Sequence, residues 1–237
     1  MSRSLTSALA SFVLLAILHT TAGFAQVTAP VPAAMPHRVA RIKQLLYERG
    51  YWITRIDSIR NSEYDLAISA FRKVEGIKQT RKFDDKQMQL LETSSRPEPR
   101  AAFLVYSQTD SVRAHIEVDL KRQVLFVIDS FGRVAHILPV SSGNGKLFTT
   151  QREDGTDNTR RALTPKGQYR ITRKIDGWRK SELGMLYYPL YYRGGAAVHG
   201  ANSVPDHPAS HGCIRIPMLA AAEFSGMIPV GFPILVY

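Results

Sequence analysis

The chain of 237 residues contains a single cysteine, Cys213, so no disulfide within the chain can hold the fold together. A packed apolar core has to do so instead, and a hydrophobic fraction of 44% is ample for one large domain or two small ones. Cys213 stands in the segment Ser210-His211-Gly212-Cys213-Ile214-Arg215, and a second His-Gly pair, His199-Gly200, lies just upstream. We therefore expect the fold to bring these two segments together.

The residue types in these segments are those of nucleophilic catalysis by a thiol. A free cysteine with a pKa near ~8.5 is mostly protonated at neutral pH, and a neighbouring imidazole can take its proton. If residues 211–213 form a strand, His211 and Cys213 point to the same side of it. Gly212 allows the backbone to approach a substrate closely, and the amides of Gly212 and Cys213 are candidates for holding an oxyanion.

Two other interpretations of the same residues have to be weighed. A lone cysteine is usually a small buried apolar residue, although the surrounding histidines and glycines then have no explanation. A zinc site could be built from His199, His207, His211 and Cys213, but their spacing matches no familiar zinc pattern. The sequence therefore favours a nucleophilic cysteine over both alternatives.

The two segments resemble the catalytic motif of the L,D-transpeptidases, the YkuD-like family. This resemblance implies a mostly β catalytic domain, a sandwich or barrel with a few helices, that needs neither metal nor cofactor. It also implies that Cys213 is the acylated nucleophile and that His199 is its base, held by the carbonyl of Gly200. Supporting roles in the oxyanion and substrate pocket then fall to Ser210, His211 and Gly212, and Arg215 becomes a support or a carboxylate contact.

The expected catalytic domain covers residues 101–237, in which short apolar strands alternate with turns. Residues 116–120 and 124–128 alternate as in a hairpin, residues 134–140 continue the pattern, and residues 229–237 end it. The polar segment 143–161 is predicted to be a loop over the cleft. Residues 164–169 resemble the family's Thr-Pro-x-Gly-x-aromatic segment. The expected substrate groove includes Met185, Tyr187 and Tyr192.

The beginning of the chain is typical of an exported protein. Residues 1–25 combine Arg3 with an apolar stretch and small residues before Gln26, as in a secretory signal peptide, and residues 26–36 form a linker rich in proline and alanine. An uncleaved anchor is the alternative. After cleavage, the protein is not expected to be an integral membrane protein but to reside in the periplasm or cell wall. The net charge of +11 suits an anionic surface, whereas no nucleic-acid-binding motif accompanies it.

The pattern of residues 37–95 predicts a small domain of three helices. A proline-containing hinge follows at residues 96–100. Apolar side chains recur at helical spacing from Val39, from Leu66 and from Met88. The layout resembles a peptidoglycan-binding-like domain, but Ser58 and Asn61 stand where that family has turn glycines. Binding of glycan strands and a purely positioning role are both open, and the pair Tyr51-Trp52 could be core or ligand platform.

The family resemblance implies a reaction on peptidoglycan stem peptides. Cys213 would form a thioester with a tetrapeptide stem, release D-Ala, and pass the acyl group to an amine, which makes a 3→3 crosslink. Carbapenems would be expected to inhibit the enzyme. The same scaffold could instead act as an L,D-carboxypeptidase or endopeptidase, or attach a protein to the wall. A catalytically silent wall-binding protein is the alternative from another functional class.

Overall fold

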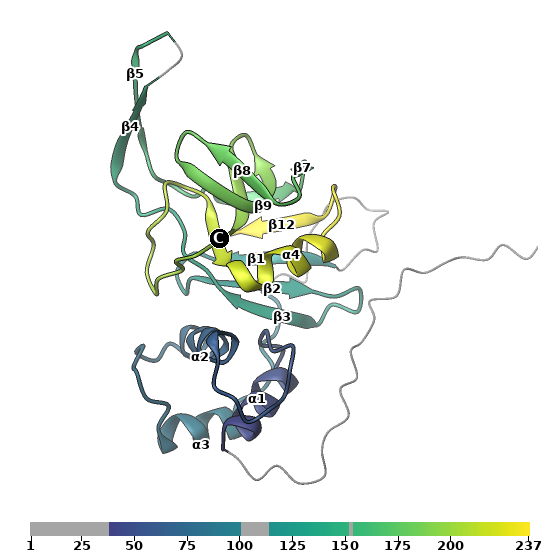
Figure 1. Ribbon diagram of the computed structural model, residues 1–237. Helices are drawn as coiled ribbons and strands as arrows, with labels where there is room; N and C mark the ends of the chain where they lie inside the picture. The colour runs from purple at the N-terminus through teal and green to yellow at the C-terminus, as the bar shows by residue number, and fades with distance from the viewer. Residues whose placement is uncertain (1–37, 101–113, 152–153) are drawn as a thin grey trace, which may run out of the picture. The chain divides into compact units, whose positions relative to one another are not determined.

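The first of two main sheets is built from the strands whose apolar alternation is clearest in the sequence. The computed structural model describes residues 38–100, 114–151 and 154–237, and this sheet has the strand order β3-β2-β1-β12-β6 (Figure 1). β1 pairs antiparallel with β2 and parallel with β12. The bounds are β1 His115–Asp119, β2 Val124–Ile128, β3 Val134–Pro139, β6 Gly167–Arg170 and β12 Pro233–Val236.

The second sheet carries the segments expected to form the site. Its order is β11-β10-β9-β7, and β8 also pairs with β9. Helix α4, Met218–Met227, follows β11, and its buried side chains join the core that both sheets share. The bounds are β7 Arg173–Lys174, β8 Trp178–Ser181, β9 Gly184–Arg193, β10 Ala196–Ala201 and β11 Ile214–Pro217. The expectation of a mostly β fold is confirmed.

The polar segment predicted to be a loop is instead largely a hairpin. β4, Leu147–Gln151, pairs antiparallel with β5, Asp157–Arg161, and Figure 1 shows the two strands extending away from the sheets. Every described side chain of these strands is exposed or half-buried, so no apolar alternation marks them. Cross-strand polar contacts stabilise the pair, including a hydrogen bond of 2.9 Å between the hydroxyls of Thr149 and Thr159.

Three helices precede the sheets, as predicted. They are α1 Arg38–Glu48, α2 Ser62–Val74 and α3 Asp85–Thr93. The Asp84 carboxylate caps α3 by accepting a hydrogen bond from the amide of Gln87 at 2.9 Å. The helices and one face of β2 and β3 share a single apolar cluster, which includes Phe71 and Leu91 from the helices and Phe126 and Ile137 from the strands.

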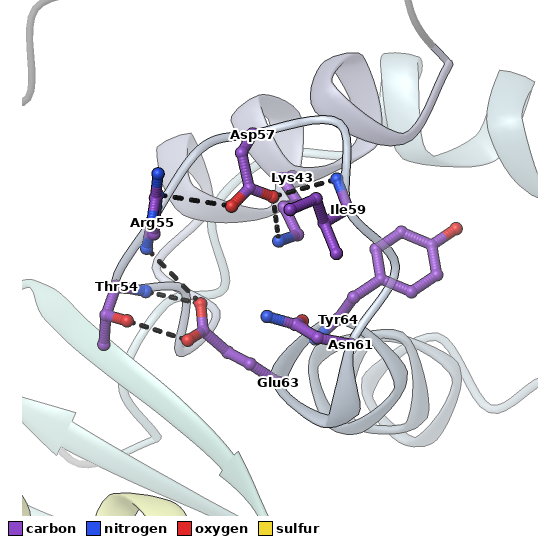
Figure 2. A network of polar contacts seen from close by, with 8 residues as sticks. All are labelled: Lys43, Thr54, Arg55, Asp57, Ile59, Asn61, Glu63 and Tyr64. Carbon is purple, nitrogen blue, oxygen red and sulfur yellow. Dashed lines mark hydrogen bonds and ion pairs between the residues drawn. The ribbon is translucent and has the colours of Figure 1, made fainter.

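The connection between α1 and α2 has Ser58 and Asn61 where the peptidoglycan-binding-like family has turn glycines, and side-chain contacts hold it instead. Asn61 has extended backbone torsions, and its side chain caps α2 by accepting from the amide of Tyr64 at 3.0 Å. Lys43, which is fully buried, forms an ion pair of 2.7 Å with Asp57 (Figure 2). Glu63 accepts from both the amide and the hydroxyl of Thr54, at 2.6 and 2.7 Å. Side-chain contacts therefore fix this connection.

Tyr51 and Trp52 belong to the core. They are 3% and 5% exposed, so neither offers a flat face to a ligand. The backbone around them pairs with β3: the amide of Trp52 donates to Ile137, and the amide of Ile137 donates to Gly50, at 3.1 and 2.8 Å. The structure therefore supports a core position for this aromatic pair rather than a role as a ligand platform.

The expected signal peptide (residues 1–25), the linker (residues 26–36) and the first residues of the expected catalytic domain (residues 101–113) lie outside the described residues. In the hinge at residues 96–100, Arg96 donates to the carbonyls of Val134 and Glu48 at 2.9 and 2.7 Å. Among the helices that the structure describes, none has both the length and the apolar character that a membrane span requires.

Candidate active site

The parallel pairing of β10 with β11 brings the two His-Gly segments together. His199 stands opposite Arg215 in the register, and Val198 stands opposite Ile214. Because side chains alternate along a strand, His199 and Arg215 share one face, while Val198 and Ile214 point into the core. Cys213 comes just before β11 and packs against Leu186, Tyr191 and Ala197 on the same side as His199. The expected catalytic pair therefore shares one cleft.

The imidazole of His199 is held in a defined orientation. Its Nδ1 lies 2.9 Å from the carbonyl oxygen of Gly200. A carbonyl oxygen can only accept, so Nδ1 carries the proton and Nε2 keeps its lone pair available as a base. This is the contact that the resemblance implied for Gly200.

Gly200 has a second reason to be glycine. A Cβ at this position would lie 2.6 Å from the Cβ of Ala221 in α4 and 3.1 Å from the ring of Tyr187. Neither neighbour is a flexible chain end, so any larger residue would push β10 away from α4. The same glycine thus orients the imidazole of His199 and allows the strand to pack on the helix.

The ionisation tendencies of the pair favour a neutral resting state. Burial lowers the pKa of His199, and the positive charge of Arg215 lowers it further, against the opposing effect of the Gly200 hydrogen bond. Burial raises the pKa of the Cys213 thiol, which the Ala197 amide and Arg215 counteract in part. A neutral thiol and a neutral imidazole then face the cleft, and the base can take the proton as the thiol attacks.

The segment containing Ser210 and Gly212 is a tight bend, and the expectation of a strand over residues 211–213 is wrong. The Ser210 hydroxyl accepts from the Gly212 amide at 3.0 Å and donates to the Cys213 carbonyl at 2.5 Å. Gly212 has φ +131°, and a Cβ there would meet the Leu163 carbonyl at 3.0 Å. The Gly212 amide is therefore committed to Ser210, and of the two amides expected to hold an oxyanion only the Cys213 amide remains a candidate.

A brace from two distant segments holds this bend, and local sequence patterns did not reveal it. The Thr164 hydroxyl accepts from the Gly143 amide at 2.8 Å and donates to the Gly212 carbonyl at 2.9 Å. The carbonyl of Ser142 accepts from the amide of Ser210 at 2.9 Å. Thr164 belongs to the Thr-Pro-x-Gly segment of residues 164–169, which is the one sequence signal that points to this role.

His211 lines the same cleft as Cys213, although residues 211–213 do not form a strand. Its ring is exposed and meets the ring of Phe148 from β4 edge-on, with centroids 4.9 Å apart. The contact joins the β4–β5 hairpin to the cysteine-bearing bend, so the hairpin forms one wall of the cleft.

The cleft has a volume of about 1580 Å³ and contains both His199 and Cys213. Met185 lines it, as expected for the substrate groove, and so do the exposed side chains of Trp178 and Leu183. Tyr187 and Tyr192 do not line it, and this part of the expectation is corrected. Tyr187 packs against Trp178 with ring centroids 4.8 Å apart, and Tyr192 is 2% exposed in the shared core.

The irregular pairing of β9 with β10 explains the placement of these tyrosines. The register shifts between Ala196 and Ala197, so that Tyr191 rather than Tyr192 stands opposite Ala197 on the cleft face. Tyr191 consequently lines the cleft. A strict alternation counted from the sequence cannot reveal such a bulge.

Of the residues considered as zinc ligands, His199, His211 and Cys213 line the cleft, whereas His207 does not. His207 is exposed and contacts Asp206, its neighbour in the chain, at 2.8 Å. Over residues 38–100, 114–151 and 154–237, no three His, Cys, Asp or Glu side chains are grouped so that they could hold a metal ion.

Comparison with known proteins agrees with this geometry. Residues 113–236 match the family model of the L,D-transpeptidase catalytic domain, YkuD. The crystal structure of an L,D-transpeptidase (residues 123–326) from Xylanimonas cellulosilytica is similar to 88% of this chain and 100% of that chain, with 32% identity and a TM-score of 0.73. None of the curated proteins matches the chain significantly.

Two further solved structures are more distant. An L,D-transpeptidase from Stackebrandtia nassauensis matches 84% of this chain and 90% of its own at 20% identity and a TM-score of 0.45. An L,D-transpeptidase from Mycobacterium smegmatis matches 53% of this chain and 58% of its own at 22% identity and a TM-score of 0.41. From the family model and the Xylanimonas structure, we conclude that this chain belongs to the L,D-transpeptidase family with a YkuD catalytic domain.

Proposed function

We propose that this chain is an exported L,D-transpeptidase that crosslinks peptidoglycan through a thioester on Cys213. The observation that carries the proposal is the orientation of His199, whose Nδ1–H donates to Gly200 and leaves Nε2 as a base in the cleft that holds Cys213. Membership of the family supports peptidoglycan as the substrate, and the proposal adds that the cleft binds its stem peptides. Export through a signal peptide at residues 1–25 is part of the proposal.

The first half-reaction consumes the donor stem. The proton of the Cys213 thiol passes to Nε2 of His199 while the sulfur attacks the carbonyl carbon of the third stem residue. The Cys213 amide faces the developing oxyanion. When the intermediate collapses, the bond to D-Ala breaks, His199 returns the proton to the departing amine, and a thioester remains.

The second half-reaction uses an acceptor. The side-chain amine of a diaminopimelate residue in another stem attacks the thioester and loses a proton to His199. The carbon–sulfur bond breaks, the sulfur recovers the proton, and a 3→3 crosslink is formed. Attack by water instead would release a tripeptide, and attack by a protein lysine would attach that protein to the wall.

The test is product mass spectrometry with the mature protein and its Cys213→Ala variant. Both are incubated with a disaccharide-tetrapeptide that contains diaminopimelate. We expect a dimer lighter than two substrate molecules by the mass of one free D-Ala, and no product from the variant. Tripeptide without dimer would identify a carboxypeptidase, and the absence of both products would refute the enzymatic proposal for this substrate.

A carbapenem provides an independent test of the nucleophile. Opening of the β-lactam ring by a thiolate adds the whole mass of the drug without releasing a group. We expect imipenem to add one drug mass to the native protein, on the peptide that contains Cys213, and nothing to Cys213→Ala. A silent wall-binding protein would show no adduct and unchanged affinity for the wall after the substitution.

A further inference from the structure

The cleft carries a concentration of positive charge that the proposed chemistry alone does not require. Its lining side chains include Lys or Arg at seven positions and one carboxylate, Glu182, whereas the whole chain has 31 basic and 20 acidic residues. The ratio of basic to acidic residues in the cleft is thus far above that of the whole chain. The basic lining residues are Arg160, Arg161, Arg173, Arg179, Lys180, Arg193 and Arg215.

These cations come from both walls of the cleft. Arg160 and Arg161 lie on β5 of the projecting hairpin, whereas Arg179 and Lys180 lie on β8. Arg215 stands on β11 beside His199, close enough to lower the pKa of both His199 and Cys213. An extended ligand bound along the cleft would therefore meet positive charge on either side of the reacting centre.

Most contacts of these side chains leave their charge uncompensated. Arg161 donates to the Gly145 carbonyl at 3.0 Å, and Arg193 donates to the Tyr169 hydroxyl at 2.7 Å, both neutral acceptors. The guanidinium of Arg173 lies 4.2 Å from the centre of the Tyr191 ring. Among the described residues, the one ion pair of these cations is between Arg160 and Glu182, at 3.8 Å.

Three of the seven cations are available to a ligand. Arg179, Lys180 and Arg215 have no hydrogen-bond or ion-pair partner for their side chains among the residues that the structure describes. Guanidinium groups bind carboxylates through paired hydrogen bonds, and charges lining a concave surface reinforce one another's field. The lining is therefore suited to a ligand with several carboxylates.

We infer that this cleft selects stem peptides whose carboxylates are free over stems in which those carboxylates are converted to primary amides. This inference rests on the proposed function, and it adds a chemical requirement on the substrate. A diaminopimelate stem carries carboxylates on its glutamate and diaminopimelate residues as well as at its end. Amidation removes their charge with little change in shape, so it isolates the electrostatic contribution.

The experiment compares two tetrapeptide stems that differ only in amidation. Binding is measured on the full chain with Cys213→Ala, which needs no turnover, and kcat/KM is measured on the native protein. We expect the free stem to bind about tenfold more tightly at low salt, because charge-assisted hydrogen bonds are replaced by neutral ones. The difference should shrink as ionic strength rises.

Matched variants test whether the cleft is the source. Arg179→Gln with Lys180→Gln removes two cations from the cleft, and Lys82→Gln with Lys86→Gln removes two exposed cations from the region around α3. The first pair should reduce the preference several-fold, and the second should leave it unchanged. Equal binding of both stems, or equal effects of the two pairs, would overturn the inference.

A failure of the charge selection and a failure of the transpeptidase reaction give different results in this experiment. Crosslinked product with no preference between stems would refute the charge selection and retain the transpeptidase. Tighter binding of the free stem by Cys213→Ala, with no product from the native protein, would support the selection and refute the reaction.

Discussion

At the scale of single residues, Arg215 influences both members of the proposed catalytic pair, His199 and Cys213. Its charge lowers the pKa of His199 and of Cys213, while burial lowers the pKa of His199 and raises that of Cys213. The base is thus kept neutral to more acidic pH than an ordinary histidine, whose pKa is about 6.5. Proton transfer from the thiol needs this neutral form.

We therefore expect kcat/KM to persist below about pH 6.5, where a free imidazole would be protonated. Replacing Arg215 with Met removes a charge that disfavours imidazolium, so the acidic limb should move to higher pH. Arg215→Lys keeps the charge and should leave the limb in place. The measurement is the pH profile of crosslinking for the three proteins, and an unmoved limb in Arg215→Met would contradict this role of the charge.

At the scale of elements, the bend before β11 depends on segments far away in the sequence. Residues 141–144 and Thr164 supply hydrogen bonds to residues 209–215, including an exchange between the backbones of Ser141 and Arg215 at 3.0 and 3.1 Å. Gly143 is locked in this arrangement, since a Cβ there would lie 2.2 Å from the Ala162 carbonyl. The position of Cys213 is therefore set by packing across three segments.

Thr164→Val tests the brace at its central hydroxyl. The substitution keeps the shape but leaves the Gly143 amide and the Gly212 carbonyl without this partner, at a cost of about 1–3 kcal/mol. We expect a lower free energy of unfolding and a reduced kcat/KM. Thr164→Ser keeps the hydroxyl and should retain most of both. Chemical denaturation and crosslinking assays measure the two effects, and equal loss in the Ser variant would exclude the hydroxyl as their cause.

The sequence predicts the features that depend on local patterns, and it does not predict those that depend on contacts between distant segments. Apolar periodicity predicted α1 and the hairpin of β1 and β2, and the His-Gly segments predicted the cleft that joins His199 with Cys213. The β4–β5 hairpin was missed because polar cross-strand contacts hold it. The commitment of the Gly212 amide to Ser210, and the displacement of Tyr192 into the core, depend on a tight bend and a bulge that alternation cannot express.

At the scale of the whole molecule, Lys73 links the helices to the site's brace. It lies on α2, is 7% exposed, and donates to the Val140 carbonyl at 2.9 Å, immediately before the bracing residues 141–144. Burial lowers the pKa of Lys73 to about 8, against an opposing effect of Asp206. The helices thus contact the segment that supports the catalytic bend, which favours a positioning role for them.

This buried ammonium predicts a specific dependence of stability on pH. Between pH 8 and about 9.5 the unfolded chain binds more protons at Lys73 than the folded one, so its contribution to the free energy of unfolding rises with pH, by about 2 kcal/mol. Lys73→Met should remove this rise. Lys78→Met, on the exposed surface nearby, should keep it. Denaturant titrations at several pH values measure the difference, and parallel curves for native protein and Lys73→Met would contradict the prediction.

The position of β12 within the first sheet has a consequence for how the nascent chain acquires its structure. Strand β12, Pro233–Val236, lies between β1 and β6. The sheet therefore lacks this interior strand until the polypeptide has been made as far as these residues. Such pairing closes a loop of more than a hundred residues and is slow compared with local contacts. Cooperative folding of the first sheet must therefore await the synthesis of β12, and the core that both sheets share is completed only then.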